Sequence, residues 1–297
     1  MGGWLTACGS FDATDTPAVV GDASPEAASS DGSPGTDGAD ADGPTLDAGC
    51  RGAFQAPRTI STLDSGIGTS LRSVRGVANG TFLISYDTSP DDNMATAMLT
   101  PAGLTLATPN PFNALNGSLE ETTPTGPSDL SFVVFASDRS SPPDGGPGIL
   151  RLWITEFSST AFGAPEYLAV AGAEPTSGPS INNPYLVGNL IYFDVQNVVG
   201  SGELVKATRN VVSVGVVPGV NNGSHPVVTK EQGELFTQIG AGILLSSRPP
   251  GATFSSQGIL AGSTGDYPTW ISDDACQLYA IHSGTGGREL RVYDRAR

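Results

Sequence analysis

The stretch YPTWISDDACQLYAIHSGTGGRELRVYD, residues 267–294, decides the fold of this 297-residue chain. It begins with an aromatic–proline pair and runs through the apolar segment Leu278–Ala280. A Gly-Gly turn then precedes a last apolar segment, Glu289–Tyr293. Short apolar segments separated by turn residues are typical of antiparallel strands. The stretch is therefore predicted to fold as consecutive strands joined by hairpins.

The same unit recurs along the chain after Cys50, and proline usually leads into it. One aromatic residue marks the apolar segment of each copy, at spacings of roughly 43 to 57 residues: Phe82, Phe135, Tyr192, Phe236 and Tyr279. A repeat of this length with four short strands is typical of a propeller blade. We predict an all-β propeller of four-stranded blades whose apolar segments form the inner strands. Five units are visible, and the two widest spacings leave room for a sixth blade.

The composition agrees with many strands and turns. The chain has 39 Gly and 23 Pro, and only 15% of its residues are charged. No window has the 3.6-residue period of a long helix, and no apolar run approaches the ~20 residues that span a membrane. The formal net charge is −16, with no basic stripe, which argues against nucleic acid as a partner.

The two ends of the repeat region predict how the ring closes. The segment Phe54–Leu63 is an isolated strand, and the chain ends after the third strand of a unit, at Val292-Tyr293. The opening strand can complete the final blade, which joins the termini and removes a sheet edge.

Residues 9–50 form a linker of Asp, Ala, Gly, Ser, Pro and Thr that carries acidic side chains but no Lys or Arg. This composition cannot bury enough apolar surface to order itself, so we expect a disordered spacer. Residues 1–8 end in Leu5-Thr6-Ala7-Cys8, which resembles the bacterial lipobox. The resemblance implies lipidation of Cys8 and a lipid-anchored envelope protein. Because only seven residues precede Cys8, either the true start codon lies upstream of Met1 or the match is due to chance, in a cytosolic protein with an incidental Cys8.

Residues 51–297 are assigned to the propeller, and two units carry a family resemblance best. These are LSFVVFASDRSSPPDGGPGILRLW, residues 130–153, and the stretch quoted first. They resemble the blade of TolB-type, WD-like propellers, in which P-x-x-S-x-D-G-x-x-L-Y-F-x-S-x-R leads to G-G-x-x-L-W. The departures include Asp274-Ala275, where the family has Asp-Gly. The resemblance implies a TolB-like β-propeller.

A disulfide between Cys50 and Cys276 follows from the expected closure. The chain has three cysteines, and lipidation would use Cys8. The remaining pair would meet in the final blade, in an oxidising compartment. The alternative is that both thiols are free.

The candidate chemical residues are few. We expect His225 and His282 to be turn or rim residues, because a metal site needs three or four clustered donors. A calcium loop at Asp87, Asp91, Asp92 and Asn93 is a weaker interpretation than a solvated hairpin tip.

Two further groups have a possible chemical role. Ser137-Asp138-Arg139 and Ser246-Ser247-Arg248 recur at matching positions, which favours local pairing of the arginines. Glu120, Glu121 and Asp129 are the carboxylates that a propeller glycosidase could use.

The sequence contains no nucleophile motif, Walker loop or dinucleotide fingerprint. We therefore expect a monomeric, non-enzymatic binding or scaffold propeller at the cell envelope, without catalytic residues, metal or cofactor. Its partner would be an envelope protein or a glycan. The alternative is a polysaccharide hydrolase or lyase, which a cluster of acidic or His side chains at one channel end would favour.

Overall fold

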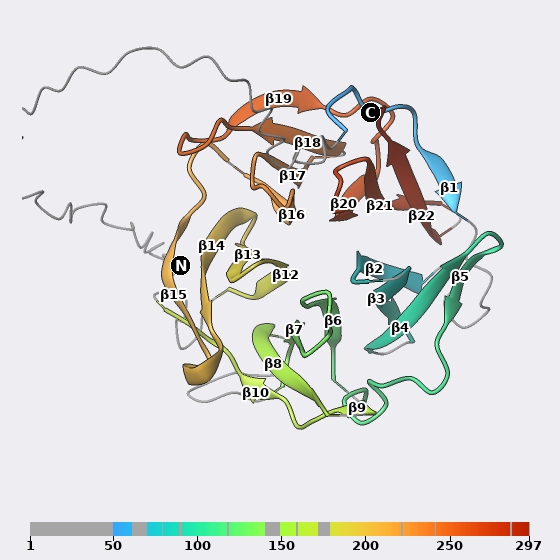
Figure 1. Ribbon diagram of the computed structural model, residues 1–297, viewed down its shortest axis with the longest axis vertical. Helices are drawn as coiled ribbons and strands as arrows, with labels where there is room; N and C mark the ends of the chain where they lie inside the picture. Colours follow the sequence, from blue (N-terminus) through green and yellow to red (C-terminus); the bar gives the residue numbers. More distant parts are fainter. Residues whose placement is uncertain are drawn as a thin grey trace, which may run out of the picture. The chain divides into compact units, whose positions relative to one another are not determined.

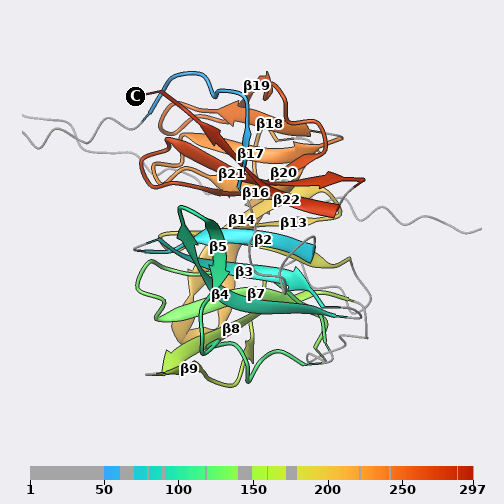
Figure 2. The ribbon, with the colours of Figure 1, turned by 90° about the vertical axis from the view of Figure 1, so that its right-hand side faces the viewer.

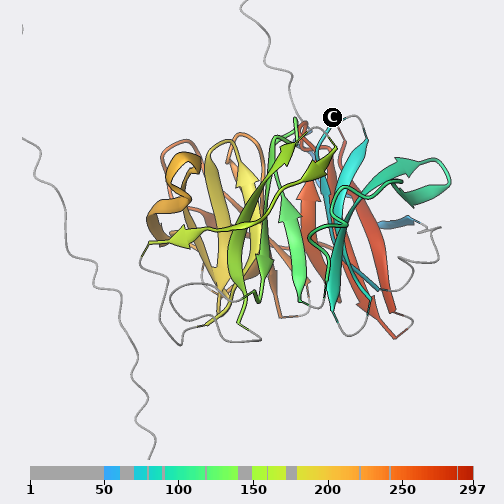
Figure 3. The same ribbon diagram turned by 90° about the horizontal axis from the view of Figure 1, so that it is seen from below.

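The computed structural model describes residues 50–60, 70–78, 80–88, 91–117, 119–139, 149–158, 160–171, 179–220, 222–240, 242–285 and 287–296. These residues form five small β-sheets around a common axis (Figure 1). The fold is a five-bladed β-propeller, and a sixth blade, which the sequence had left possible, is not among the described residues. The views at right angles show the strands running along the axis (Figures 2 and 3).

Each blade has an inner strand near the axis and further strands outward, and the pairing is antiparallel except at the outer edge of the third blade. The first two blades consist of the following strands: β2 (Leu71–Gly76), β3 (Thr81–Asp87), β4 (Asp92–Thr100) and β5 (Gly103–Leu106), then β6 (Glu121–Thr125), β7 (Phe132–Ser137), β8 (Arg151–Ser158) and β10 (Glu166–Tyr167), with β9 (Ala161–Phe162) also on β8.

The third and fourth blades follow the same plan. Their strands are β12 (Ile181–Val187), β13 (Leu190–Val195), β14 (Val198–Val205) and β15 (Asn210–Val216), with β11 (Ala169–Val170) parallel to β15, then β16 (Ser224–Val228), β17 (Glu234–Ile239), β18 (Gly242–Ser247) and β19 (Ser255–Ile259). A 3-10 turn, η2 (Lys206–Thr208), precedes β15. No helix among the described residues is long and apolar enough to cross a membrane.

The fifth blade joins the two ends of the propeller, as the sequence predicted. It contains β20 (Asp266–Ile271), β21 (Gln277–Gly284) and β22 (Gly287–Asp294). The opening strand β1 (Arg58–Ile60) pairs antiparallel with β22, and the two ends of the colour scale lie side by side (Figure 1). Strand β22 is thus no longer the outer edge of the sheet.

A disulfide and an arginine strengthen this closure. Cys50 and Cys276 are bonded, so the predicted disulfide is present in the structure. The buried Arg295 donates a hydrogen bond to the backbone oxygen of Cys50 (3.1 Å) and forms an ion pair with Glu234 of blade four (2.8 Å). Its guanidinium also lies 4.0 Å from the ring centre of Phe54. Arg295 therefore connects the first and last segments of the propeller to each other and to blade four.

The strand that lines the axis differs from the one that the sequence indicated. The apolar runs form the second strand of each blade, such as β7, whose residues are all buried. The innermost strands of blades two to five are instead those that contain the proline. Proline lacks an N–H donor and is tolerated only at a sheet edge or a bulge, and each inner strand has both features.

The core lies between neighbouring blades. Four apolar clusters each join two or three blades, and Leu83 with Phe135 and Ile84 with Ile281 are examples of fully buried pairs. Burying one such side chain stabilises the fold by about 1.5–3 kcal/mol. The packing holds the five inner strands in contact around the axis, with β20 next to β2.

Candidate functional site

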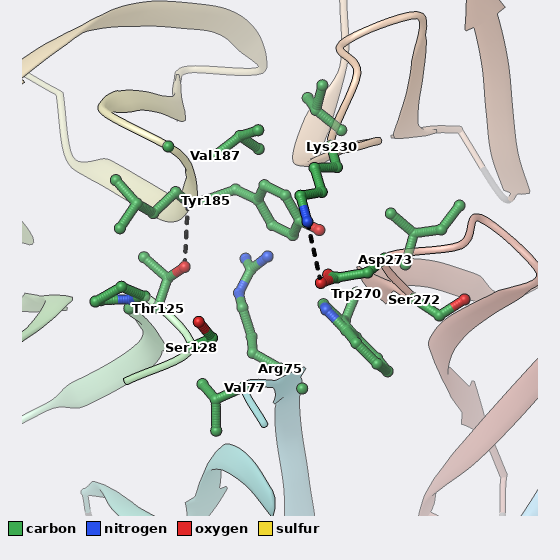
Figure 4. Close-up of a pocket in the computed structure, with 17 residues that line it drawn as sticks. Arg75, Val77, Thr125, Ser128, Tyr185, Val187, Lys230, Trp270, Ser272 and Asp273 are labelled. Atoms are coloured by element: carbon green, nitrogen blue, oxygen red, sulfur yellow. Dashed lines mark hydrogen bonds and ion pairs between the residues drawn. The ribbon is translucent and has the colours of Figure 1, made fainter. Parts of the chain in front are cut away.

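All five inner strands contribute to one pocket on the axis, at their C-terminal ends (Figure 4). The pocket has a volume of about 260 Å³. Each blade supplies a short run of lining residues: 75–77, 125–128, 185–188, 228 with 230, and 270–273. A site built by all blades is fixed by the whole ring rather than by one loop.

Arg75 of β2 reaches the middle of this pocket (Figure 4). The residue is only 4% exposed, and its guanidinium lies 4.3 Å from the ring centre of Tyr185. Its Nε and Nη1 atoms are buried and have no hydrogen-bond partner among the described residues. Burial lowers the pKa of Arg75 to about 10, so the group is still charged at neutral pH.

The bulge in β2 explains how the strand carries a cation inward. The register of β2 against β3 shifts between Leu71 and Ser73. Beyond that point Ser73 and Arg75 share one face of the strand, because side chains alternate. On that face the hydroxyls of Ser73 and of Ser85 in β3 form a hydrogen bond of 2.8 Å. The sequence therefore forms a polar face that ends at Arg75.

Aromatic side chains form part of the wall. Burial raises the pKa of Tyr185 to about 12, so its hydroxyl stays protonated. The Trp270 ring packs edge-on against Phe82, with centroids 5.4 Å apart. Gly76 is needed here, since a Cβ on it would lie 2.3 Å from the Trp270 ring. The wall is thus rigid on this side.

Polar groups complete the lining. The Thr125 hydroxyl accepts the backbone N–H of Leu186 (3.1 Å), which joins blades two and three. Lys230 and Asp273 form an exposed ion pair of 3.7 Å between blades four and five. Asp273 is the only carboxylate among the described lining residues, and the lining includes no His or Cys. Such a pocket can bind a polar ligand, but it does not have the two carboxylates of a glycosidase.

His225 lies on the inner strand β16 rather than on the rim, so the expectation of a rim residue was wrong. Its backbone has a positive φ of 53°, directly before Pro226, and its ring packs on Tyr267 at 4.5 Å. Its backbone N–H donates to Asp194 Oδ2 (3.1 Å), which also accepts Asn183 Nδ2 (2.6 Å). Burial lowers the pKa of His225 to about 3, which keeps the ring neutral.

The opposite end of the inner strands carries a group of charged residues. Asp92 begins β4 and is buried, so it does not belong to a solvated hairpin tip as expected. Its Oδ1 lies 3.1 Å from Arg72 Nε, and Arg72 also pairs with Asp87 (3.3 Å). Burial raises the pKa of both Asp92 and Glu120. A hydrolysis that uses these carboxylates would have to take place at this end of the inner strands, opposite the axial pocket.

The other residues that the sequence singled out serve the blades. His282 contacts Asp266 at 2.6 Å within blade five. Arg139 pairs with Glu121 at 2.8 Å, and Arg248 donates to the backbone oxygen of Gln232 at 3.0 Å, so both arginines pair locally as predicted.

The remaining candidates lie in an exposed turn or outside the described residues. The Asp129 carboxylate accepts the Ser131 N–H (2.9 Å) in an exposed turn. The described part of the chain has no group of three His, Cys, Asp or Glu side chains arranged to hold a metal. Cys8 and the linker up to residue 49 lie outside the described residues.

The residues that line the axial pocket were missed by sequence reasoning. Arg75 lies in the degenerate first copy of the repeat, in the strand LRSVRG. A cation in an otherwise half-apolar strand was a signal that it is held inside the protein. The other lining residues come singly from distant repeats, so no local motif brings them together.

Comparison with known proteins shows only the fold. No family model and no curated protein matches the sequence. The catalytic domain of a GH62 α-L-arabinofuranosidase from Coprinopsis cinerea is 10% identical with a TM-score of 0.52, over 84% of this chain and 98% of that one. An α-L-arabinofuranosidase from Podospora anserina, solved with cellotriose, is 8% identical with a TM-score of 0.50, over the same shares.

A TolB structure from Acinetobacter baumannii is also similar, at 12% identity and a TM-score of 0.38, over 77% of this chain and 44% of that one. At these identities the likeness to the two arabinofuranosidases concerns the fold and not an activity.

Proposed function

We propose that this propeller is a non-catalytic module that binds the end of a glycan in its axial pocket. The observation that carries the proposal is the lining, which combines hydroxyls, aromatic rings and cations with a single carboxylate. Saccharides are bound by such mixtures of aromatic surface and a few placed polar groups. A volume of about 260 Å³ suits one sugar residue better than a long chain.

The rival is a polysaccharide hydrolase at the opposite end of the axis. It is favoured by the raised pKa values of Asp92 and Glu120, since a general acid must hold its proton near neutral pH. Hydrolysis also needs a second carboxylate placed for a water or a covalent intermediate. Asp92 is already paired with Arg72, which opposes that role.

Titration calorimetry with neutral mono- and oligosaccharides, with product analysis of the same samples, separates the two functions. We expect saturable binding without release of free sugar. Ser128→Trp would fill the pocket and abolish binding, whereas Ser256→Trp on the exposed outer strand β19 is the matched control. Sugar release that Asp92→Asn abolishes and Ser128→Trp spares would instead establish the hydrolase.

We further propose that the module is a TolB-type envelope lipoprotein anchored through Cys8 and a spacer, and that it acts as a monomer. The support is the lipobox-like segment Leu5–Cys8 and the acidic linker. Expression of the gene with its upstream extension and labelled palmitate tests the anchor. Label that persists in Cys8→Ser would place the attachment elsewhere.

A further inference from the structure

The axial pocket contains a positive charge that the protein does not neutralise. The Arg75 guanidinium points into the middle of the pocket, away from the β2 backbone (Figure 4). Its closest described partner is the face of Tyr185, which stabilises a cation by about 1–2 kcal/mol. Two of its buried nitrogens donate no hydrogen bond within the described residues.

Burying a guanidinium without an anion is costly, because several kcal/mol of hydration are lost. The fold could have placed an apolar side chain here, as it does at Val74 next to it. A cation kept at such a position indicates a site that an anion completes. The anion must come from outside the described part of the chain.

The charges of the pocket indicate how much negative charge it takes. Arg75 and Lys230 contribute two positive charges, and Asp273 contributes one negative charge. Lys230 and Asp273 neutralise one another at the exposed rim, at 3.7 Å. The balance is one positive charge, which a monoanion matches. A doubly charged phosphate would bring excess negative charge close to Asp273.

We propose that Arg75 binds the carboxylate of an acidic saccharide, a uronic acid residue at the end of a glycan. This rests on the proposed function and names its ligand class. The planar guanidinium presents paired N–H donors that match a carboxylate in geometry. The sugar ring would then lie beside the exposed Ser128, and the buried Thr125 hydroxyl, which accepts the Leu186 N–H, can still donate to it.

Matched ligands test the inference on the unaltered protein. Glucuronate, glucuronamide and glucose share a ring and differ at one position, so calorimetry with all three isolates the carboxylate. We expect glucuronate to bind about tenfold or more tightly than either neutral analogue. The preference should weaken as salt is added, though less than for a surface pair, because the site is buried.

Two variants locate the effect. Arg75→Met keeps an unbranched side chain and removes the charge, and it is expected to make the three ligands bind equally. Arg51→Met, at an exposed arginine that does not line the pocket, is the matched control and should change affinity less than about threefold. Thermal unfolding of each variant shows that the fold is intact.

The possible outcomes test carboxylate binding by Arg75 separately from glycan binding by the pocket. Equal binding of glucuronate and glucose by the unaltered protein would overturn the carboxylate and leave glycan binding standing. No binding of any of the three would overturn both. Tighter binding of glucose 6-phosphate than of glucuronate would also overturn the carboxylate, in favour of a phosphate site. If Arg75→Met still prefers glucuronate to the same extent, the carboxylate binds at another site and the assignment to Arg75 is overturned.

Discussion

Removing the Cys50–Cys276 disulfide is expected to destabilise the propeller strongly. The bond closes a loop with a sequence separation of 226 residues. In the chain-entropy model a loop of this length restricts the unfolded chain by an amount worth about 5 kcal/mol at 25 °C. That is a large share of the roughly 5–15 kcal/mol by which domains are stable.

The strand pairing at the closure is short. Strand β1 has three residues paired with β22, and an isolated bridge joins Phe54 to Arg295. Loss of the disulfide therefore leaves the outer strand of the fifth blade held by this short pairing and by the contacts of Arg295. Local opening at β1 is expected before the rest of the ring unfolds.

Urea unfolding of the double variant Cys50→Ser with Cys276→Ser measures the effect, with Cys8→Ser as the matched control. If unfolding has a slope near about 3 kcal/mol per molar urea, the midpoint falls by roughly 1.5 M. The control should keep its midpoint. A midpoint that falls by less than about 0.3 M in the double variant would refute the loop-entropy reasoning and assign closure to the non-covalent contacts.

Three further outcomes are expected. Arg295→Met removes the buried end of the closing ion pair and should lower the unfolding free energy by about 2–3 kcal/mol in urea titrations; a change below about 0.5 kcal/mol would contradict this. His225 has a folded pKa of about 3, below its ordinary 6.5, so protonation favours the unfolded state and stability falls as pH drops through that window. The midpoint of His225→Asn, which tolerates the positive φ, should depend less on pH between 6.5 and 3, and an identical pH profile would exclude the effect. Gly76→Ala places a Cβ against the Trp270 ring and should lower the unfolding free energy by about 1–3 kcal/mol. Gly215→Ala is the control: it has open space around it and should change the unfolding free energy by less than about 0.5 kcal/mol. Similar values for the two variants would contradict the steric argument.

The repeat and its closure could be predicted from the sequence because they depend on local patterns. Proline, an apolar run and a glycine turn recur in each unit, and hairpins follow from such short-range signals. The closing strand and the disulfide followed from where the first and last units begin and end. The number of blades did not, because aromatic spacing does not separate an eroded blade from a long connection. Part of the widest spacing holds the short extra strands β9, β10 and β11.

The order of strands within a blade was harder to predict. Apolar runs were taken for the inner strands, since burial and hydrophobicity usually agree. In a propeller the second strand is the one covered on both faces by neighbouring blades, while the innermost strand is a sheet edge beside the axis. Proline at 124, 184, 226 and 268 was the signal for that edge.

The pocket was beyond the reach of the sequence for a different reason. Its lining comes from five inner strands, whose positions between Arg75 and Asp273 are spread over most of the propeller. No spacing rule links them until the ring is closed. Buried Asp92 was misplaced because a run of acidic residues after a strand is typical of a solvated turn. Its partner, Arg72, lies in β2, on the other side of β3, and supplies the compensating charge.

The way the ring closes also sets the order in which the propeller can assemble during translation. Strand β1 is among the first parts of the propeller to be synthesised, yet its pairing partner β22 is the last strand to be made. The ribosome must therefore reach β22 before the first strand can be used. The first four blades do not depend on that step, whereas a chain truncated before residue 287 would lack the strand that receives β1. The ring of this protein can close only once β22 has been made.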